Sequence, residues 1–359
     1  MKVTIDGIRY GLDPKKLTAN LRKVIKCGES LVLSNFVEYE GKYYELVSLQ
    51  GDAFEGCTKL TSLTISKSIN NITLPIQLPT SLETVNVEES NLKYDSRDNC
   101  NAIIETKSNT LVGGCKNSTI PAGVTKIGFR AFYCSPITSI DIPDSITVIE
   151  CQAFCSSSLQ SLKFSNSTID IGTHAFSNCE YLTHVFIPRE LVIIEHPIFS
   201  GCSSLTSISV DRDNPKFDSR EDCNAIIETA TNKLILGCHN TVIPNSVTSI
   251  EFAFMWCSSL KSIVIPDSVA TIGIGSFYGC TSLETIEIPK TVTEIERSAF
   301  EDCTALISIV YKGTMQEWEQ IKKGDMWNFM VPAEVIHCVD GDIKNIEYDT
   351  HGVNKIIKL

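Results

Sequence analysis

Cysteine is the residue type whose number and spacing could support chemistry here, because the chain of 359 residues contains 15 cysteines. Seven stand three residues before a recurring leucine or isoleucine: Cys57, Cys134, Cys179, Cys202, Cys257, Cys280 and Cys303. Four form two pairs 15 residues apart, Cys100 with Cys115 and Cys223 with Cys238, and the others are Cys27, Cys151, Cys155 and Cys338. Such thiols can form disulfides, bind a metal ion or act as nucleophiles.

The other reactive residues give no support to metal binding or catalysis. The chain has no C-x-x-C motif, and its six histidines are scattered: His174, His184, His196, His239, His337 and His351. Asp211, Asp213 and Asp222 fall at positions 1, 3 and 12 of a calcium loop, but Pro215 and Lys216 occupy positions that need a ligand and a glycine. We therefore expect no catalytic residues, no cofactor and no metal site, and a protein that is not an enzyme.

A repeat of 22 or 23 residues is the element that positions these cysteines. Its key residues are Leu60, Leu82, Ile137, Leu159, Leu182, Leu205, Leu260, Leu283 and Leu306, with two longer gaps of 55 residues. In the copy at 283–289, LETIEIP, apolar and polar residues alternate as in a half-buried strand, and Pro289 ends it. Val292 and Ile295 then supply a second apolar pair. One such coil cannot bury its own apolar face, so the coils must stack into a solenoid.

The two longer gaps contain a duplicated insert. YDSRDNCNAIIET at 94–106 and FDSREDCNAIIET at 217–229 are offset by 123 residues, like Leu82 and Leu205. In each copy AIIE, a polar turn and then LVGGC or LILGC predict a hairpin. We place these hairpin inserts at 88–119 and 211–242.

The ends of the chain differ from the repeats and are expected to cap the solenoid. Residues 1–47 are assigned to N-terminal capping hairpins, with turns at Asp6-Gly7 and Glu40-Gly41, and to the first coil. The repeats occupy 48–312. Residues 313–359 are assigned to a C-terminal cap of helix and strand, whose helix begins with a capping box of Thr314 and Glu317.

The recurring segments AFEGCTKLTSL, AFSNCEYLTHVFIP, SFYGCTSLETIEIP and AFEDCTALISI resemble the BspA-like leucine-rich repeat proteins, a family of bacterial surface proteins with a 23-residue repeat. The resemblance covers about residues 48 to 312, and the tail YKGTMQEWEQI also resembles that family. It implies a right-handed leucine-rich-repeat solenoid of short parallel strands with short helical or 3-10 turns, its sheet on the concave side. Two coils depart from the pattern: Leu82 follows LPIQLPTS, and the coil at Leu159 has Ser156 where cysteine is expected.

In a stacked solenoid the seven repeat cysteines are predicted to fill the core as free thiols. Equivalent positions on adjacent coils lie about 4.8 Å apart with parallel side chains, whereas a disulfide needs Cβ atoms about 3.8 Å apart that face each other. The paired hairpin cysteines are better disulfide candidates than the repeat cysteines.

The outward strand positions are the candidate binding surface. Two residues after each key position stand Ser62, Thr84, Ser139, Ser161, His184, Ser207, Ser262, Thr285 and Ser308. The middle coil breaks this row of hydroxyls and places His184 and Phe186 outward, beside Lys163 of the coil before. An aromatic residue among polar groups is typical of binding hot spots, so we predict a binding site at Lys163, His184 and Phe186. The alternatives are a single exposed aromatic residue without a role, and contact through the hairpin inserts with Arg97 and Arg220.

The composition limits the class of partner. The net charge of −12 and the lack of a basic stripe exclude nucleic acid, and no apolar run reaches the ~18 residues of a membrane span. With the family resemblance, we expect a non-enzymatic scaffold, secreted or at the cell surface, that acts as an adhesin. Its partner would be a host matrix protein, another cell-surface protein or a glycan. MKVTIDGIRYGLD contains no signal peptide, so this expectation requires a leader outside the sequence. The alternative is a cytoplasmic interaction or structural solenoid, which many free thiols would suit.

Overall fold

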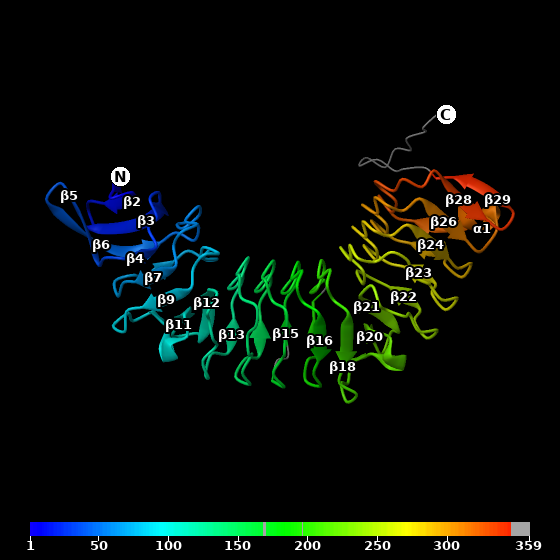
Figure 1. The fold of residues 1–359 in the computed structure, drawn as a ribbon, viewed down its shortest axis with the longest axis horizontal. Helices are drawn as coiled ribbons and strands as arrows, with labels where there is room; N and C mark the ends of the chain where they lie inside the picture. Colours follow the sequence, from blue (N-terminus) through cyan, green and yellow to red (C-terminus); the bar gives the residue numbers. More distant parts are fainter. Residues whose placement is uncertain (168–169, 196, 346–359) are drawn as a thin grey trace. The chain divides into compact units, whose positions relative to one another are not determined.

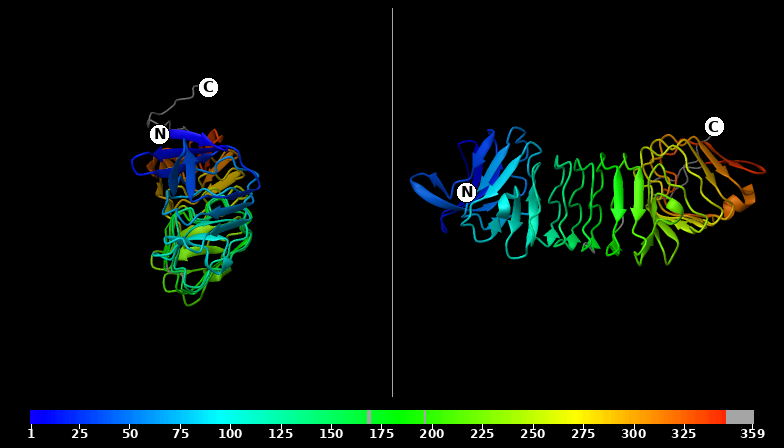
Figure 2. Two further views of the ribbon diagram at one scale, coloured as in Figure 1. Left: turned by 90° about the vertical axis from the view of Figure 1, so that its left-hand side faces the viewer. Right: turned by 60° about the horizontal axis from the view of Figure 1, so that its bottom comes forward.

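The structure is a computed structural model that describes residues 1–167, 170–195 and 197–345. Contacts divide the chain into two compact units, Met1–Phe176 and Ser177–Leu359, each a stack of short coils (Figures 1 and 2). His196, His351 and the end of the C-terminal cap lie outside the described residues. The boundaries 1–47, 48–312 and 313–359 stay a proposal about the organisation of the chain.

The first unit begins with a sheet of strand order β1-β2-β3-β6-β5, with β8 also paired to β6. The bounds are β1 Lys2–Ile5, β2 Ile8–Asp13, β3 Thr18–Val24, β5 Phe36–Tyr39, β6 Lys42–Leu49 and β8 Asn71–Ile72. Ile5 pairs with Ile8, and Tyr39 pairs with Lys42. Both hairpins therefore turn at the predicted Asp-Gly and Glu-Gly pairs, where Asp6 and Glu40 adopt φ of 49° and 51°.

Two further sheets of the first unit follow the repeat. One is β4 Ser30–Val32, β7 Ser62–Ile65 and β9 Thr84–Val87, all parallel. The other runs through β10 Tyr94–Asp95, β11 Ala102–Glu105, β12 Thr110–Gly114, β13 Lys126–Ile127, β14 Val148–Ile149 and β15 Asp170–Ile171. Strands β10, β11 and β12 are antiparallel, with a 3-10 turn η1 at Arg97–Asn99, and form the predicted hairpin insert.

The second unit repeats this arrangement. Its strands are β16 His184–Ile187, β17 Ile193–Ile194, β18 Ser207–Val210, β19 Phe217–Asp218, β20 Ala225–Glu228, β21 Lys233–Gly237, β22 Ser249–Ile250, β23 Thr271–Ile272, β24 Thr285–Ile288, β25 Glu294–Ile295, β26 Ser308–Tyr311, β27 Lys322–Lys323, β28 Val335–Cys338 and β29 Gly341–Lys344. A 3-10 turn η2 at Arg220–Asp222 lies between β19 and β20. Strands β16 and β18 pair in parallel, as do β24 and β26, so equivalent residues of successive coils lie side by side.

Stacked phenylalanines form the centre of each unit. In the first unit the Phe132, Phe154 and Phe176 rings are parallel, with centroids 4.8 and 5.1 Å apart. In the second unit Phe254, Phe277 and Phe300 stack at 5.2 Å. These separations match the spacing of parallel strands, so each ring lies on the ring of the next coil.

Each phenylalanine stack begins at a glycine of a hairpin insert. A Cβ atom at Gly114 would overlap the ring of Phe132, and one at Gly237 would overlap the ring of Phe254. Only a residue without a side chain lets the hairpin backbone approach the first ring so closely. This contact explains Gly114 in LVGGC and Gly237 in LILGC.

The turn after each phenylalanine contains a residue of positive φ followed by a buried residue. The positive-φ residues are Gly56, Cys134, Ser156, Asn178, Gly201, Trp256, Gly279 and Asp302, with φ from 55° to 87°. The buried residues after them are Cys57, Ser135, Ser157, Cys179, Cys202, Cys257, Cys280 and Cys303. We call this second set the buried row.

The buried row corrects two sequence assignments. The coils that contain Cys134 and Ser156 have one residue fewer between the phenylalanine and the key residue. Cys134 therefore occupies the positive-φ turn and is exposed, while Ser135 is buried in its place. In the next coil Ser157, not Ser156, takes the buried position.

The disulfide prediction also needs correction. Cys57 is not a free thiol: it forms a disulfide with Cys27, with Cα atoms 5.4 Å apart. The hairpin cysteines, which were the better candidates, are all free and buried. The prediction of free thiols compared only equivalent cysteines of adjacent coils. Cys27 lies in the N-terminal cap, outside the buried row, and pairs with Cys57 from there.

The C-terminal cap covers the last coil as expected. Helix α1, Met315–Gln320, begins with the predicted capping box: the Thr314 hydroxyl accepts from the Glu317 backbone N–H, and the Glu317 carboxylate accepts from the Thr314 N–H. Trp318 is buried, with its ring centroid 5.2 Å from that of Tyr311 and 5.9 Å from that of Trp327. The remaining coils are connected by turns, and helix is scarce in the described residues.

Candidate binding surface

The outward strand positions are created by the alternation predicted from the sequence. Strands β9, β16 and β24 all show exposed and buried residues in strict alternation. Parallel pairing aligns these positions between coils, as Thr84 lies beside Ser62 and Asn86 beside Thr64. In the coils at Ile137, Leu159 and Leu260 the strand is reduced to isolated bridges, Asp141 with Lys163 and Val264 with Glu287.

Lys163 lies on the outward surface of the first unit. It is exposed and forms a parallel bridge with Asp141 of the preceding coil. An open hollow of about 540 Å³ is lined here by Asp141, Ile142, Pro143, Asp144, Lys163, Phe164, Ser165 and Asn166. Within the described residues Lys163 has no ion-pair partner. The hollow thus offers a lysine and two carboxylates to a ligand.

His184 and Phe186 lie together on β16 of the second unit, on the same outward face. The imidazole Nδ1 of His184 is 2.8 Å from the hydroxyl oxygen of Thr183. The Phe186 side chain is 47% exposed, and Ser207 and Ser209 of β18 lie beside the pair. The exposed Phe186 ring and the His184 imidazole therefore lie next to the small serine side chains of the following coil.

The structure brings His184 and Phe186 together, whereas Lys163 belongs to the other unit, so the three-residue site stays a prediction. Sequence reasoning missed Asp141 and Asp144 as part of the surface around Lys163. The signal was available: Asp141 stands 22 residues before Lys163, at the same outward position of the preceding coil.

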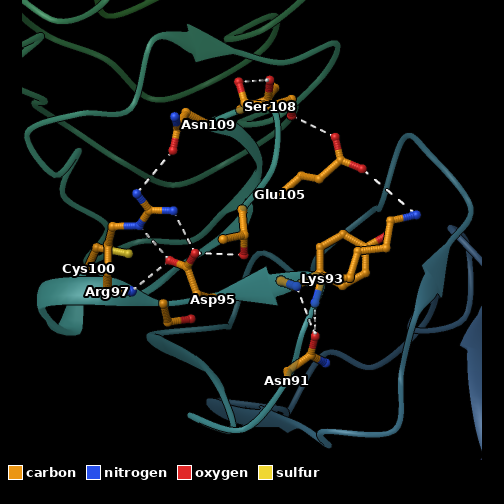
Figure 3. A network of polar contacts seen from close by, with 12 residues as sticks. Asn91, Lys93, Asp95, Arg97, Cys100, Glu105, Ser108 and Asn109 are labelled. Carbon is orange, nitrogen blue, oxygen red and sulfur yellow. Dashed lines mark hydrogen bonds and ion pairs between the residues drawn. The ribbon is translucent and has the colours of Figure 1, made fainter.

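The arginines of the hairpin inserts are held in internal networks. The Arg97 guanidinium donates to both carboxylate oxygens of Asp95, at 2.8 and 2.6 Å, and to the Asn109 side chain at 3.1 Å (Figure 3). The Thr106 hydroxyl also donates to Asp95 at 2.9 Å. Burial raises the pKa of Asp95, but these hydrogen bonds outweigh it and leave the pKa below its usual value.

The second insert repeats the network residue by residue. Arg220 donates to Asp218 at 2.7 and 2.5 Å and to Asn232 at 2.8 Å, and the Thr229 hydroxyl donates to Asp218 at 2.9 Å. The pKa of Asp218 is lowered in the same way, with burial opposing the hydrogen bonds. A guanidinium that is already paired is a poor contact for a partner, so these networks favour a structural role for the inserts.

No group of three or more His, Cys, Asp or Glu able to hold a metal ion occurs within the described ranges. In the same residues no helix has the length and apolar character to cross a membrane.

Comparison with known families identifies the repeat. The model of the family described as "BspA type Leucine rich repeat region" matches residues 42–104, 103–224 and 232–323, in six copies. The chain belongs to the BspA-type leucine-rich repeat family. No curated protein matches it.

The fold of this BspA-type protein also occurs in a solved structure with a TM-score above 0.5. The pneumococcal vaccine antigen PcpA is 18% identical, with a TM-score of 0.56, over 94% of this chain and 81% of that chain. A leucine rich cell surface protein from Faecalibacterium prausnitzii is 23% identical, with a TM-score of 0.46, over 90% of this chain and 97% of that chain. A leucine-rich repeat protein from Bacteroides ovatus is 20% identical, with a TM-score of 0.38, over 94% and 90%. Sequence identities this low bear on the fold of this chain and not on its function.

Proposed function

We propose that this BspA-type solenoid is a non-enzymatic adhesin that binds a protein partner through the outward faces of its strands. The observation that carries the proposal is the variation among the outward strand positions within each unit. Two residues after the key position, eight of nine coils have serine or threonine and His184 is the exception. Four residues after the key position the residue type varies from coil to coil and includes Asp141, Lys163 and Phe186. Repeat scaffolds bind through varied residues on a constant frame, so these positions are where a partner is recognised.

We further propose that the protein acts at the cell surface or in secreted form, on a host matrix protein or a protein of a neighbouring cell. The match to the BspA-type family supports this placement, because the family resemblance implies bacterial surface proteins. The Cys27–Cys57 disulfide supports it too, because disulfides persist in oxidising compartments. The 13 free cysteines favour the second candidate, a cytoplasmic interaction solenoid. Protease treatment of intact source cells decides between them: loss of the protein from the cell envelope supports the first, and full protection supports the second.

The binding proposal is tested with an identified partner from a screen of matrix proteins and glycans. The double variant His184→Ser and Phe186→Ser addresses the second unit, and Lys163→Ser addresses the first. Loss of a central contact lowers affinity by about tenfold or more. Lys59→Ser, at an exposed turn position outside the strand faces, is the matched control and is expected to bind as the wild type does. Unchanged affinity in both test variants rejects the strand faces as the binding surface.

A further inference from the structure

We propose that Trp256, Tyr278 and Asp302 form a site on the second unit that binds an arginine side chain of a partner protein. These residues lie in the turns of three consecutive coils, not on the strand faces. The inference therefore stands or fails separately from the proposed function.

The fold places the three residues in the corresponding turns of consecutive coils. Trp256, Gly279 and Asp302 each immediately precede a cysteine of the buried row and have φ of 59°, 71° and 58°. The backbone N–H of Trp256 donates to the carbonyl of Tyr278 at 2.6 Å, and that of Gly279 donates to the carbonyl of Glu301 at 2.8 Å. These bonds hold the turns in register, so the side chains follow one another at the spacing of the coils.

Gly279 makes room for the indole of Trp256. A Cβ atom on Gly279 would overlap the six-membered ring of Trp256, so this ring lies directly over the glycine backbone. The indole thereby extends from its own coil toward the coil of Asp302. The Trp256 side chain is 39% exposed, which leaves part of it open to a ligand.

Tyr278 completes an aromatic corner. Its ring centroid is 4.8 Å from that of Trp256, and the ring planes meet at 72°. In this edge-to-face arrangement the rings support each other, and the indole is held in place. The corner is thus a fixed platform, and little side-chain freedom is lost when a ligand stacks on it.

Negative charge lies next to this platform. Burial raises the pKa of Tyr278, and the nearby carboxylates of Asp302 and Glu301 raise it further. Neither acid forms an ion pair with Lys, Arg or His in residues 1–167, 170–195 and 197–345. The aromatic surface is therefore bordered by carboxylates that have no basic partner.

An aromatic face beside a carboxylate has the chemistry that recognises a guanidinium. This group is planar, so it can stack on an indole while its N–H groups donate to a carboxylate. A lysine ammonium is compact and strongly hydrated, and it cannot make both contacts in one plane. The net charge of −12 also favours approach by a basic partner.

The tryptophans of the chain supply the readout. Trp318 and Trp327 are buried, 3% and 2% exposed, so a surface ligand that quenches indole fluorescence reports on Trp256. The probe is a short peptide in which a single arginine is the only charged side chain. It is compared with the same peptide carrying lysine or citrulline in place of the arginine. We expect saturable quenching by the arginine peptide, weaker binding of the lysine peptide and no binding of the citrulline peptide.

Single substitutions test whether the Asp302 carboxylate contributes to binding of the arginine peptide. Asp302→Asn is expected to weaken binding of the arginine peptide by about fivefold, the scale of one exposed charged contact. Asp267→Asn removes an equal charge at an exposed turn position and is expected to leave binding unchanged. If Asp302→Asn does not fold, Tyr278→Leu takes its place, with the same expected loss. Equal binding of the arginine and citrulline peptides, or an Asp302→Asn protein that binds as the wild type does, overturns the proposal.

Discussion

The thiol sulfur of Cys303 lies 3.1 Å from the carbonyl oxygen of Phe277, one coil earlier, and donates a hydrogen bond to it. Cys280 makes the same contact, also at 3.1 Å, with the carbonyl of Phe254. The buried cysteines of these coils therefore fill volume and also donate a second hydrogen bond to a carbonyl that already accepts one from a backbone N–H of its own turn.

We predict that Cys303→Ala destabilises the second unit by about 1–2 kcal/mol, because both apolar volume and a buried hydrogen bond are lost. Urea unfolding followed by circular dichroism measures the change. Cys338→Ala, at a partly exposed cysteine, is the control and should change stability far less. An equal effect of the two variants would contradict a role for the buried row in the packing.

Thiol labelling of the native protein should separate two classes of cysteine. Cys134 and Cys151 are exposed and should react first, whereas burial raises the pKa of Cys257 to about 11 and keeps it as a thiol at pH 8. Peptide mapping after a brief alkylation identifies the modified residues. Labelling of Cys257 as fast as Cys134 would show that the turn exposes the buried row.

Acid should weaken the two hairpin inserts. Because Asp95 and Asp218 have lowered pKa values, their unfolded carboxyls take up protons at a higher pH than the folded ones. The stability they contribute is present above about pH 4 and is lost as the pH falls through the folded pKa.

The double variant Asp95→Asn and Asp218→Asn tests this pH dependence. It should be less stable than the wild type at pH 7 and should lose less stability on acidification, as measured by urea unfolding across the pH range. The single control Asp267→Asn should keep the wild-type acid response. A double variant with the wild-type response would assign the acid sensitivity to other groups.

The glycine that begins a phenylalanine stack should not tolerate a side chain. Gly237→Ala places a methyl group against the Phe254 ring and should destabilise the second unit by about 1–3 kcal/mol, the usual scale of an overpacked core. Gly28→Ala is a fair control because its added Cβ would meet only one atom, at 3.9 Å. Thermal unfolding of both variants measures the difference, and equal midpoints would contradict the close approach.

The sequence predicted the features that depend on local pattern. The alternation in LETIEIP gave β24, the Asp6-Gly7 pair gave the first hairpin, and Thr314 with Glu317 gave the start of α1. The features that depend on turn geometry were not accessible in this way. Counting back from the key residue placed Cys134 in the core, because a deletion in the turn changes which residue takes the positive φ.

The candidate site was predictable only in part. Outward positions follow from strand alternation, so the exposure of Lys163, His184 and Phe186 could be read from the sequence. The hollow beside Lys163 depends on how the side chains of two coils are arranged, which spacing alone does not specify. The Trp256–Tyr278 contact was missed because both residues lie in turns, where no periodic pattern indicates which side chains meet.

The matching networks of Asp95 with Arg97 and of Asp218 with Arg220 have a consequence for how the gene can change. The bonds that Arg97 makes to Asp95 and Asn109 at one insert match those that Arg220 makes to Asp218 and Asn232 at the other. Unequal recombination that adds or deletes one segment of 123 residues would leave those surroundings intact. The chain can thus gain or lose whole blocks of repeat coils during evolution. Its length would change while the fold stays the same.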